Sequence, residues 1–339
     1  MTKHVTKVVG WSASLLALAA TASADIKLNE NFSVGGYAAA SYEYFKQDPG
    51  SSYDALFNGG VSTPSADAVK TIFTANFKPV TGVVSLFYIP NIPSGVMRNE
   101  TTILDAYVTY DAGGGVSITG GKFLSYMGYE AFDPVNMSQI TYSPVTVGTL
   151  SSIPAYHSGV KFDYSDSAFG AGFAILDSVF SPNGIDKGDG ELKHNAGFEG
   201  YIKYTGVPDL VLWAGFAHDT KGNFQSHKVT VLDFWAEYKI TKMLTVAGEF
   251  ASKNGGDFNK GTTWLAYLNY AFTDKFSVVG RVGGEDLGGK TAGSDFIQYT
   301  VGPSAKITDN LTIRAEYSYY DYDNGFEKSL FGVQAIFKF

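Results

Sequence analysis

The chain has 339 residues, of which 45% are hydrophobic and 17% charged, and its formal net charge is −8. It contains no cysteine, which excludes disulfide scaffolds, thiolate metal sites and cysteine nucleophiles. The acidic balance argues against a nucleic-acid-binding protein. Few charges, 39 glycines, 22 tyrosines and 25 phenylalanines together favour strands whose outer face meets something other than water.

The first elements in chain order are those of an export signal. Lys3 and Lys7 precede an apolar run over residues 8–20, and Ala22-Ser23-Ala24 has the small side chains of a cleavage site. A membrane anchor is the alternative, but the apolar run is too short for one. We therefore predict a cleaved signal peptide at 1–24 and an exported single domain at 25–339.

Strict alternation of apolar and polar residues follows along the rest of the chain. In the last segment Phe331, Val333 and Phe337 fall on one face, and Gln334 and Lys338 fall on the other. Such alternation predicts strands with two different faces. The expected strands are 31–45, 67–78, 82–90, 102–111, 115–123, 155–165, 168–178, 195–205, 208–218, 226–240, 242–253, 260–272, 275–285, 294–307, 310–322 and 327–339.

The links between these strands alternate in length. Links 46–66 and 124–154 are long, whereas 79–81, 206–207 and 273–274 are short. Short periplasmic turns and long extracellular loops are typical of an all-β, transmembrane, antiparallel up-and-down β-barrel, here of about 16 strands within a range of about 14–18. A closed sheet also gives every backbone group a partner inside lipid. A soluble sandwich alternates too, but the inner faces carry too many charges for a dry core.

Two stretches resemble a known family. They are Gly-Gly-Lys-Phe-Leu-Ser-Tyr-Met-Gly-Tyr-Glu at 120–130, followed by Asn136, and Ile-Pro-Ala-Tyr-His-Ser-Gly-Val at 153–160. Together they resemble the OmpL-like β-barrel porins of Gram-negative outer membranes, most closely in the central third of the chain. Gln139 departs from the pattern, which leads us to expect arginine there. The resemblance implies a pore for small hydrophilic solutes.

The end of the chain resembles the signal read by the outer-membrane assembly machinery. Phe339 is the last residue, and Gly332, Ala335 and Phe337 precede it. The expected partners are therefore this machinery, outer-membrane lipid and lipopolysaccharide, and small hydrophilic solutes. Monomer and homotrimer both stay open.

The link 124–154 is the third outer loop and the longest one. In general porins this loop folds into the lumen and narrows it, and low charge with several aromatics suits burial there. The alternative is a lid over the mouth. The candidate constriction residues are Tyr126, Tyr129, Glu130, Asp133, Asn136, Gln139 and Tyr142.

The alternation also predicts charged side chains that face the lumen. They would set a transverse field that selects solutes, or else pair across strands and only keep the lumen wet. The candidates are Lys70, Asp105, Lys161, Asp163, Glu199, Lys203, Asp233, Glu237, Lys239, Glu249, Arg281, Glu285, Arg314 and Glu316.

No sequence feature calls for a cofactor, a metal or a catalytic group. The mature histidines have no metal-ligand spacing, and Gly120-Gly121-Lys122 lacks the rest of a phosphate-binding loop. We expect a porin that works by passive diffusion. The alternatives are a barrel hydrolase, for which His218 and Asp219 are the tempting pair, and a closed structural or adhesive barrel that conducts nothing.

Overall fold

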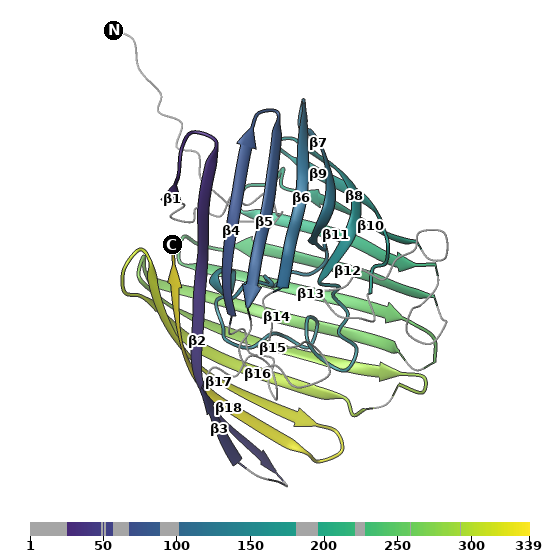
Figure 1. The fold of residues 1–339 in the computed structure, drawn as a ribbon. Helices are drawn as coiled ribbons and strands as arrows, with labels where there is room; N and C mark the ends of the chain where they lie inside the picture. Colours follow the sequence, from purple (N-terminus) through teal and green to yellow (C-terminus); the bar gives the residue numbers. More distant parts are fainter. Residues whose placement is uncertain are drawn as a thin grey trace.

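The computed structural model describes residues 26–48, 50, 52–56, 68–88, 102–180, 196–220, 228–257, 259–291 and 293–339. These residues form an antiparallel sheet that closes into a barrel where its last strand pairs with the first long one (Figure 1). The barrel wall has 16 strands, which confirms the predicted fold class. The expected signal peptide at 1–24 lies outside the described residues.

The wall strands follow one another around the barrel in chain order. They are β2 (Phe32–Asp48), β4 (Ala68–Phe77), β5 (Val80–Tyr88), β6 (Thr102–Gly113), β7 (Val116–Leu124), β8 (Tyr156–Ser165), β9 (Phe169–Leu176), β10 (Gly197–Tyr204), β11 (Leu210–Asp219), β12 (Val229–Lys239), β13 (Leu244–Asn254), β14 (Lys260–Thr273), β15 (Phe276–Gly288), β16 (Phe296–Lys306), β17 (Leu311–Tyr322) and β18 (Glu327–Lys338).

Two short strands pair with the ends of β2. They are β1 (Ile26–Lys27) and β3 (Ser52–Leu56), and β3 lies within a link that was expected to be loop. Among the described residues the single helical segment is a 3-10 turn, η1 (Pro134–Asn136). No described helix is long and apolar enough to cross a membrane.

Side-chain exposure alternates along the wall strands as the sequence pattern predicts. On β12, Leu232 and Phe234 are 45% and 49% exposed, while the intervening Asp233 and the next residue, Trp235, are 0% and 8% exposed. The outer face is therefore apolar and the inner face polar or aromatic. A shift of one residue in pairing would exchange the two faces, so this pattern specifies the register.

Every link at one rim of the barrel, which we call the short-turn rim, has two to five residues, and the segment 125–155 leaves the opposite rim, which also carries the short links 255–259 and 323–326 (Figure 1). Gly114 and Gly115 make the β6–β7 turn with φ values of +64° and +85°, a backbone region that glycine adopts without a steric penalty. The chain closes at the same rim, where the backbone N–H of Gly36 donates to Phe339 at 2.8 Å and that of Phe339 donates to Gly36 at 3.0 Å.

Candidate pore constriction

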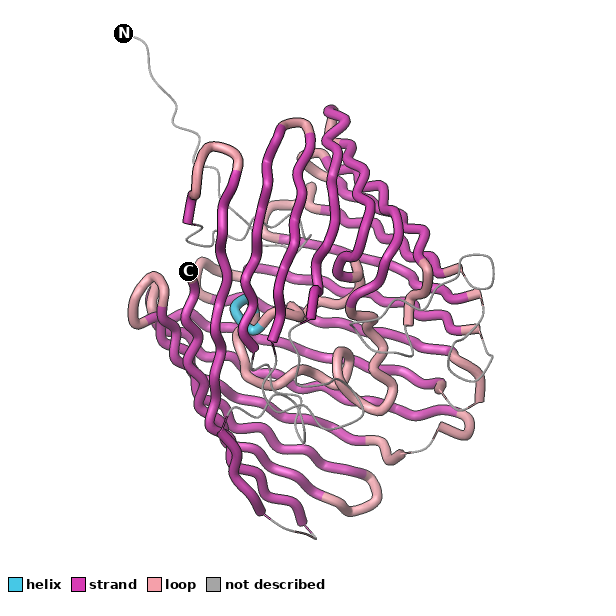
Figure 2. Tube along the Cα trace, viewed as in Figure 1, coloured by secondary structure: helices cyan, strands magenta, loops and turns pink. Residues whose placement is uncertain are grey.

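The segment between β7 and β8, residues 125–155, folds back into the barrel. We call this segment the inner loop; Figure 2 shows it with η1 inside the ring of strands. Its residues make hydrogen bonds or ring contacts with the inner faces of β2, β4, β10, β12, β13, β14, β15 and β17. The inner loop therefore contacts a large part of the wall circumference.

Wall carboxylates hold the backbone of the inner loop by accepting hydrogen bonds from its N–H groups. Glu199 accepts from Tyr126 at 3.1 Å, Asp233 from Gly128 at 2.9 Å, Glu249 from Tyr129 at 2.7 Å, Glu285 from Thr149 at 3.2 Å and Leu150 at 3.3 Å, and Glu316 from Ile140 and Thr141. Buried N–H groups need such partners, because an unpaired one costs about 1–3 kcal/mol. These predicted lumen charges thus bind the loop.

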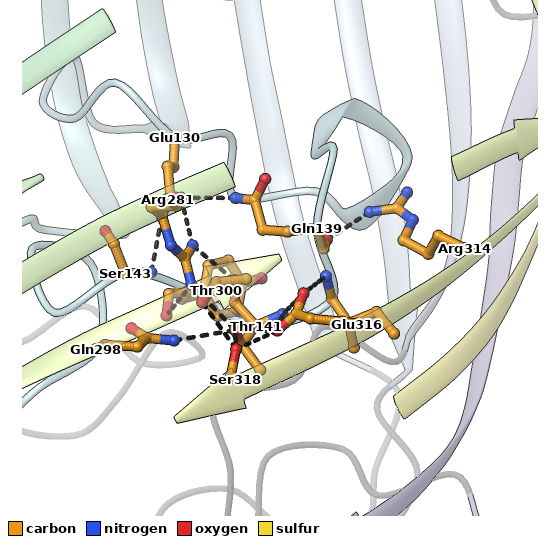
Figure 3. Close-up of polar contacts among 12 residues, drawn as sticks. Glu130, Gln139, Thr141, Ser143, Arg281, Gln298, Thr300, Arg314, Glu316 and Ser318 are labelled. Carbon is orange, nitrogen blue, oxygen red and sulfur yellow. Dashed lines mark hydrogen bonds and ion pairs between the residues drawn. The ribbon is translucent and has the colours of Figure 1, made fainter. Parts of the chain in front are cut away.

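Wall cations bind the carbonyl groups of the same segment. Figure 3 shows Arg281 and Arg314 reaching it from the wall. Arg281 donates to Thr141 at 2.8 Å and Tyr142 at 3.2 Å, Arg314 donates to Pro134 at 2.9 Å and to Gln139, and Lys253 donates to Leu150 at 2.6 Å and Ser151 at 3.1 Å. The wall therefore binds both the N–H groups and the carbonyl groups of the inner-loop backbone. Lys253 was not among the predicted lumen charges, although its alternation with Glu249 places it on the inner face.

The two carboxylates of the inner loop are paired with wall cations. The side chain of Glu130 is 2% exposed and forms an ion pair with Arg281. Asp133 lies 3.0 Å from the ammonium of Lys70 and accepts a hydrogen bond from the Tyr37 hydroxyl at 2.8 Å. The loop therefore lies close enough to the wall for both carboxylates to be neutralised there.

The tyrosines of the inner loop pack against the wall and the loop itself. The Tyr126 ring lies 4.7 Å from that of Tyr201, and the Tyr129 ring lies 5.5 Å from that of Trp235. The Tyr129 hydroxyl donates to Glu237 at 2.9 Å. Burial, and secondly the Glu237 carboxylate, raise the pKa of Tyr129 above its ordinary value, so this hydroxyl stays protonated.

Tyr142, Asn136 and Gln139 complete the candidate loop residues. The Tyr142 hydroxyl donates within the loop to the carbonyl of Phe132 at 2.6 Å, and Asn136 is exposed. The Gln139 side chain donates to Glu130 at 2.6 Å. Where the family pattern led us to expect an arginine, the positive charge near the loop comes from the wall instead.

The other predicted lumen charges lie on the same inner face with fewer loop contacts. Asp105 pairs with Lys70 at 2.9 Å, the ammonium of Lys161 lies 5.0 Å from the centre of the Tyr126 ring, and Asp163 accepts from Tyr201 at 3.4 Å. Within the described ranges, the ammonium groups of Lys203 and Lys239 have no ion pair or hydrogen bond.

The residues of the expected assembly signal lie on the closing strand. Phe337 is 49% exposed on the outer face, and its ring stacks on Phe339 at 6.1 Å. Gly332 faces inward, where an added Cβ would lie 3.1 Å from Ile140 of the inner loop. A small residue at 332 thus leaves room for the loop.

The hydrolase pair does not assemble. Asp219 accepts hydrogen bonds from the backbone of Val179 and Phe180 at 2.7 and 3.0 Å, and His218 contacts Thr230 on the neighbouring strand at 2.8 Å. Neighbouring strand residues point to opposite faces. In the part of the chain that the structure describes, no three His, Asp or Glu side chains are grouped to hold a metal ion.

A closed 16-strand barrel with an apolar outer face, a polar inner face and an infolded third outer loop defines an outer-membrane channel of the porin type. The chain belongs to the family described as "Putative beta-barrel porin-2, OmpL-like", whose model matches residues 31–339. This confirms the resemblance noted in the sequence. No curated protein sequence matches the chain.

Solved porin structures share the fold. OmpF of Salmonella typhi is 14% identical with a TM-score of 0.68, covering 92% of this chain and 100% of that chain. An anion-selective porin from Comamonas acidovorans is 12% identical with a TM-score of 0.66, covering 91% and 99%. OmpT of Vibrio cholerae is 14% identical with a TM-score of 0.60, covering 93% and 100%. At these identities the likeness concerns the fold alone.

Proposed function

We propose that the channel lets small hydrophilic solutes or ions cross the outer membrane by passive diffusion, and that the inner loop is its constriction. The barrel replaces lipid with water along the path, and the loop limits passage by size and charge. The observation that carries the proposal is the docking of the loop by wall groups of both signs, such as Glu316 and Arg281.

Selectivity then depends on charges that are not bound to the loop backbone. Charges in close pairs, such as Glu130 with Arg281, cancel at a distance, whereas Lys203 and Lys239 keep their fields in the lumen. Glu237 and Asp163, whose hydrogen-bond partners among the described residues are tyrosine hydroxyls, oppose them with negative charge. A passing ion would therefore encounter both signs along the inner wall.

Planar-bilayer recording of the purified protein tests the proposal. Stepwise currents in KCl, with a reversal potential set by a salt gradient, are expected. A protein that inserts into the bilayer and gives no steps would instead be the closed structural or adhesive barrel. Hydrolysis of lipid or peptide that depends on Asp219 would favour the enzyme, although the backbone contacts of Asp219 argue against that.

We infer that export removes residues 1–24 and that the mature chain begins at Asp25. The mass of the protein extracted from outer membranes would show this directly. A mass that includes residues 1–24 would contradict it.

We also infer a homotrimer in the membrane. One solved structure with this fold is an in-vitro folded OmpT of Vibrio cholerae in a trimer form, 15% identical to this chain. Native mass spectrometry of the detergent-extracted protein distinguishes a trimer from a monomer.

A further inference from the structure

The short-turn rim carries its charges unevenly. At the turns after β6, β8 and β10, residues 111–115, 165–168 and 204–209 include Asp111, Asp166 and Asp209 and no lysine or arginine. From the end of β12 to the end of β18 the same rim carries five lysines against two aspartates, although the whole chain has a net charge of −8. We call this part of the rim the lysine arc. Its charged residues are Lys239, Lys242, Asp274, Lys275, Lys306, Asp309 and Lys338.

Backbone hydrogen bonds place the turns of the lysine arc side by side. The N–H group of Lys306, at the end of β16, donates to the carbonyl of Lys275 in the β14–β15 turn at 2.8 Å. The N–H group of Lys338, at the end of β18, donates to the carbonyl of Asn310 in the β16–β17 turn, also at 2.8 Å. Lysines that are far apart in the sequence therefore share one part of the rim.

The aspartates of the lysine arc do not neutralise its lysines. Asp309 lies 2.9 Å from the ammonium of Lys306. The hydrogen bond and charge of Lys306, followed by the charges of Lys275 and Lys338, lower the pKa of Asp309 below its ordinary value, so several ammonium groups act on this one carboxylate. Within the ranges that the structure describes, the ammonium groups of Lys242 and Lys275 have no ion pair or hydrogen bond.

A hollow of about 500 Å³ lies beside the lysine arc at the mouth of the barrel. Lys242, Lys275 and Lys306 line it, together with Asp274. Five polar side chains, one from each of the strands β13 to β17, also line it. They are Thr245, Asn269, Ser277, Ser304 and Thr312. Each lies an even number of positions from an inward residue of its own strand, as Ser277 does from Arg281, so the hollow borders the lumen.

This lining suits a small anion with several charges. Ammonium groups donate hydrogen bonds, hydroxyl and amide groups can donate them, and the oxygens of a phosphate or carboxylate accept them. Hydrogen bonds that involve charged groups are about twice as strong as neutral ones. A single exposed ion pair still contributes little, so an anion with one charge would be held weakly, whereas a polyanion can contact lysines of several turns at once. The volume of the hollow lies within the range of about 300–1,000 Å³ for small-molecule sites.

We propose that the lysine arc and the hollow beside it bind a small polyanion, with phosphate or carboxylate groups, at the short-turn mouth of the channel. This rests on the proposed channel function and names a solute class for it. A polyanion bound there would obstruct the ion path at that mouth. The phosphate of a membrane lipid offers the same oxygen atoms to these lysines, so the two sources are separated below by the choice of lipid.

Inorganic triphosphate, added to one chamber at a time during planar-bilayer recording, tests this inference. In about 0.1 M KCl, where the Debye length is about 10 Å, triphosphate should lower the wild-type current in a saturable way. The block should come from one chamber only, because the inner loop lies between the lysine arc and the other chamber. In about 1 M KCl the block should weaken, since charges are then screened within about 3 Å.

Lys242→Gln combined with Lys275→Gln is the test variant, because it removes two charges that line the hollow without breaking an ion pair. The half-blocking triphosphate concentration should rise by roughly two- to thirtyfold, the loss of two exposed charge contacts. An unchanged concentration would overturn the site.

Lys27→Gln combined with Lys78→Gln is the matched control. It removes two exposed lysines near the same rim but outside the lysine arc, so the change in net charge is the same. This variant should keep the wild-type block. An equal loss in the two double variants would contradict the site, since the effect would then follow the net charge of the protein.

The outcomes separate this inference from the function it rests on. A protein that gives no current in KCl overturns the proposed channel. A channel that conducts normally but is not blocked by triphosphate from either chamber overturns only the polyanion site. Block in membranes of glycerol monooleate, which has no phosphate, with none in membranes of phosphatidylcholine would assign the lysines to lipid phosphate and would also overturn the solute site.

Discussion

At the scale of single residues, Glu130 connects the inner loop to the wall and to two other positions of the loop itself. Its carboxylate pairs with Arg281 of β15 and accepts hydrogen bonds from the Gln139 side chain at 2.6 Å and the Ser143 N–H at 2.8 Å. Arg281 in turn is 2% exposed and binds two loop carbonyls. Both charges are removed from water, so each depends on the other.

Replacing Glu130 by Gln should loosen the inner loop. The guanidinium of Arg281 would stay buried without its counter-charge, and breaking a buried ion pair costs about 3–5 kcal/mol. We expect a lower unfolding temperature for Glu130→Gln, measured as the temperature at which the folded band is lost on a heat-modifiability gel.

Two further variants control this prediction. Asp309→Asn removes the exposed pair with Lys306, 2.9 Å apart at the short-turn rim, and should leave the transition unchanged. Glu130→Gln combined with Arg281→Met removes both charges and should recover part of the lost stability. If the single Glu130→Gln variant unfolded at the same temperature as the wild type, the ion pair would not be what holds the loop.

At the scale of elements, the strands were predictable and the contacts of the inner loop were not. Alternation depends on neighbouring residues, so β12 and β18 can be recognised within a few residues of their observed bounds. Glu316 binds Thr141 across 175 positions, and no local pattern encodes such a contact. The alternation therefore indicates that Glu316 faces inward but not that the loop backbone is its partner.

The closing seam between β18 and β2 depends on the last residue of the chain. Phe339 exchanges two backbone hydrogen bonds with Gly36, and an added Cβ at Gly36 would lie 3.0 Å from the Phe339 ring and 2.1 Å from the Lys70 carbonyl. Deleting Phe339 removes both bonds and the terminal aromatic. We expect less heat-modifiable protein in isolated outer membranes.

Phe337→Ala offers a comparison, because it keeps the backbone of the seam and removes only an outward ring. A smaller loss for Phe337→Ala than for the deletion would indicate that seam closure dominates. Wild-type levels after deletion of Phe339 would contradict the assembly role.

At the scale of the whole molecule, the difference between the two rims gives the expected orientation, because the inner loop leaves one rim and only turns of two to five residues lie at the other. The cysteine-free sequence allows single cysteines to report it. A cysteine at Asp323, in the link between β17 and β18, should react with an impermeant thiol reagent on intact cells. Cysteines at Asp274 and Asp309 lie in short turns at the opposite rim and should not react. Asn183 is a second expected outer position, outside the described residues. Labelling at Asp274 and Asp309 but not at Asp323 would show that the barrel has the opposite orientation in the membrane.

The sequence indicates which residues face the lumen or lie in the loop, but it does not indicate which partner each of them binds. The inner-face charges follow from alternation, and the loop was singled out by its length and aromatic content. Pairing could not be read from the sequence, because Asp133 meets Lys70 only after the barrel has closed and the loop has entered it.

The central claim is that the inner loop narrows the channel. Single-channel conductance tests it in a variant that lacks residues 138–147 and joins the remaining ends through two glycines. Arg281 and Glu316 then lose loop partners but gain water in a wider lumen, so the barrel should still fold. A matched two-residue deletion of Asn324 and Gly325, in the exposed β17–β18 link, should leave the conductance unchanged. We predict a higher conductance for the inner-loop deletion alone, and an unchanged conductance in a folded deletion variant would contradict the claim.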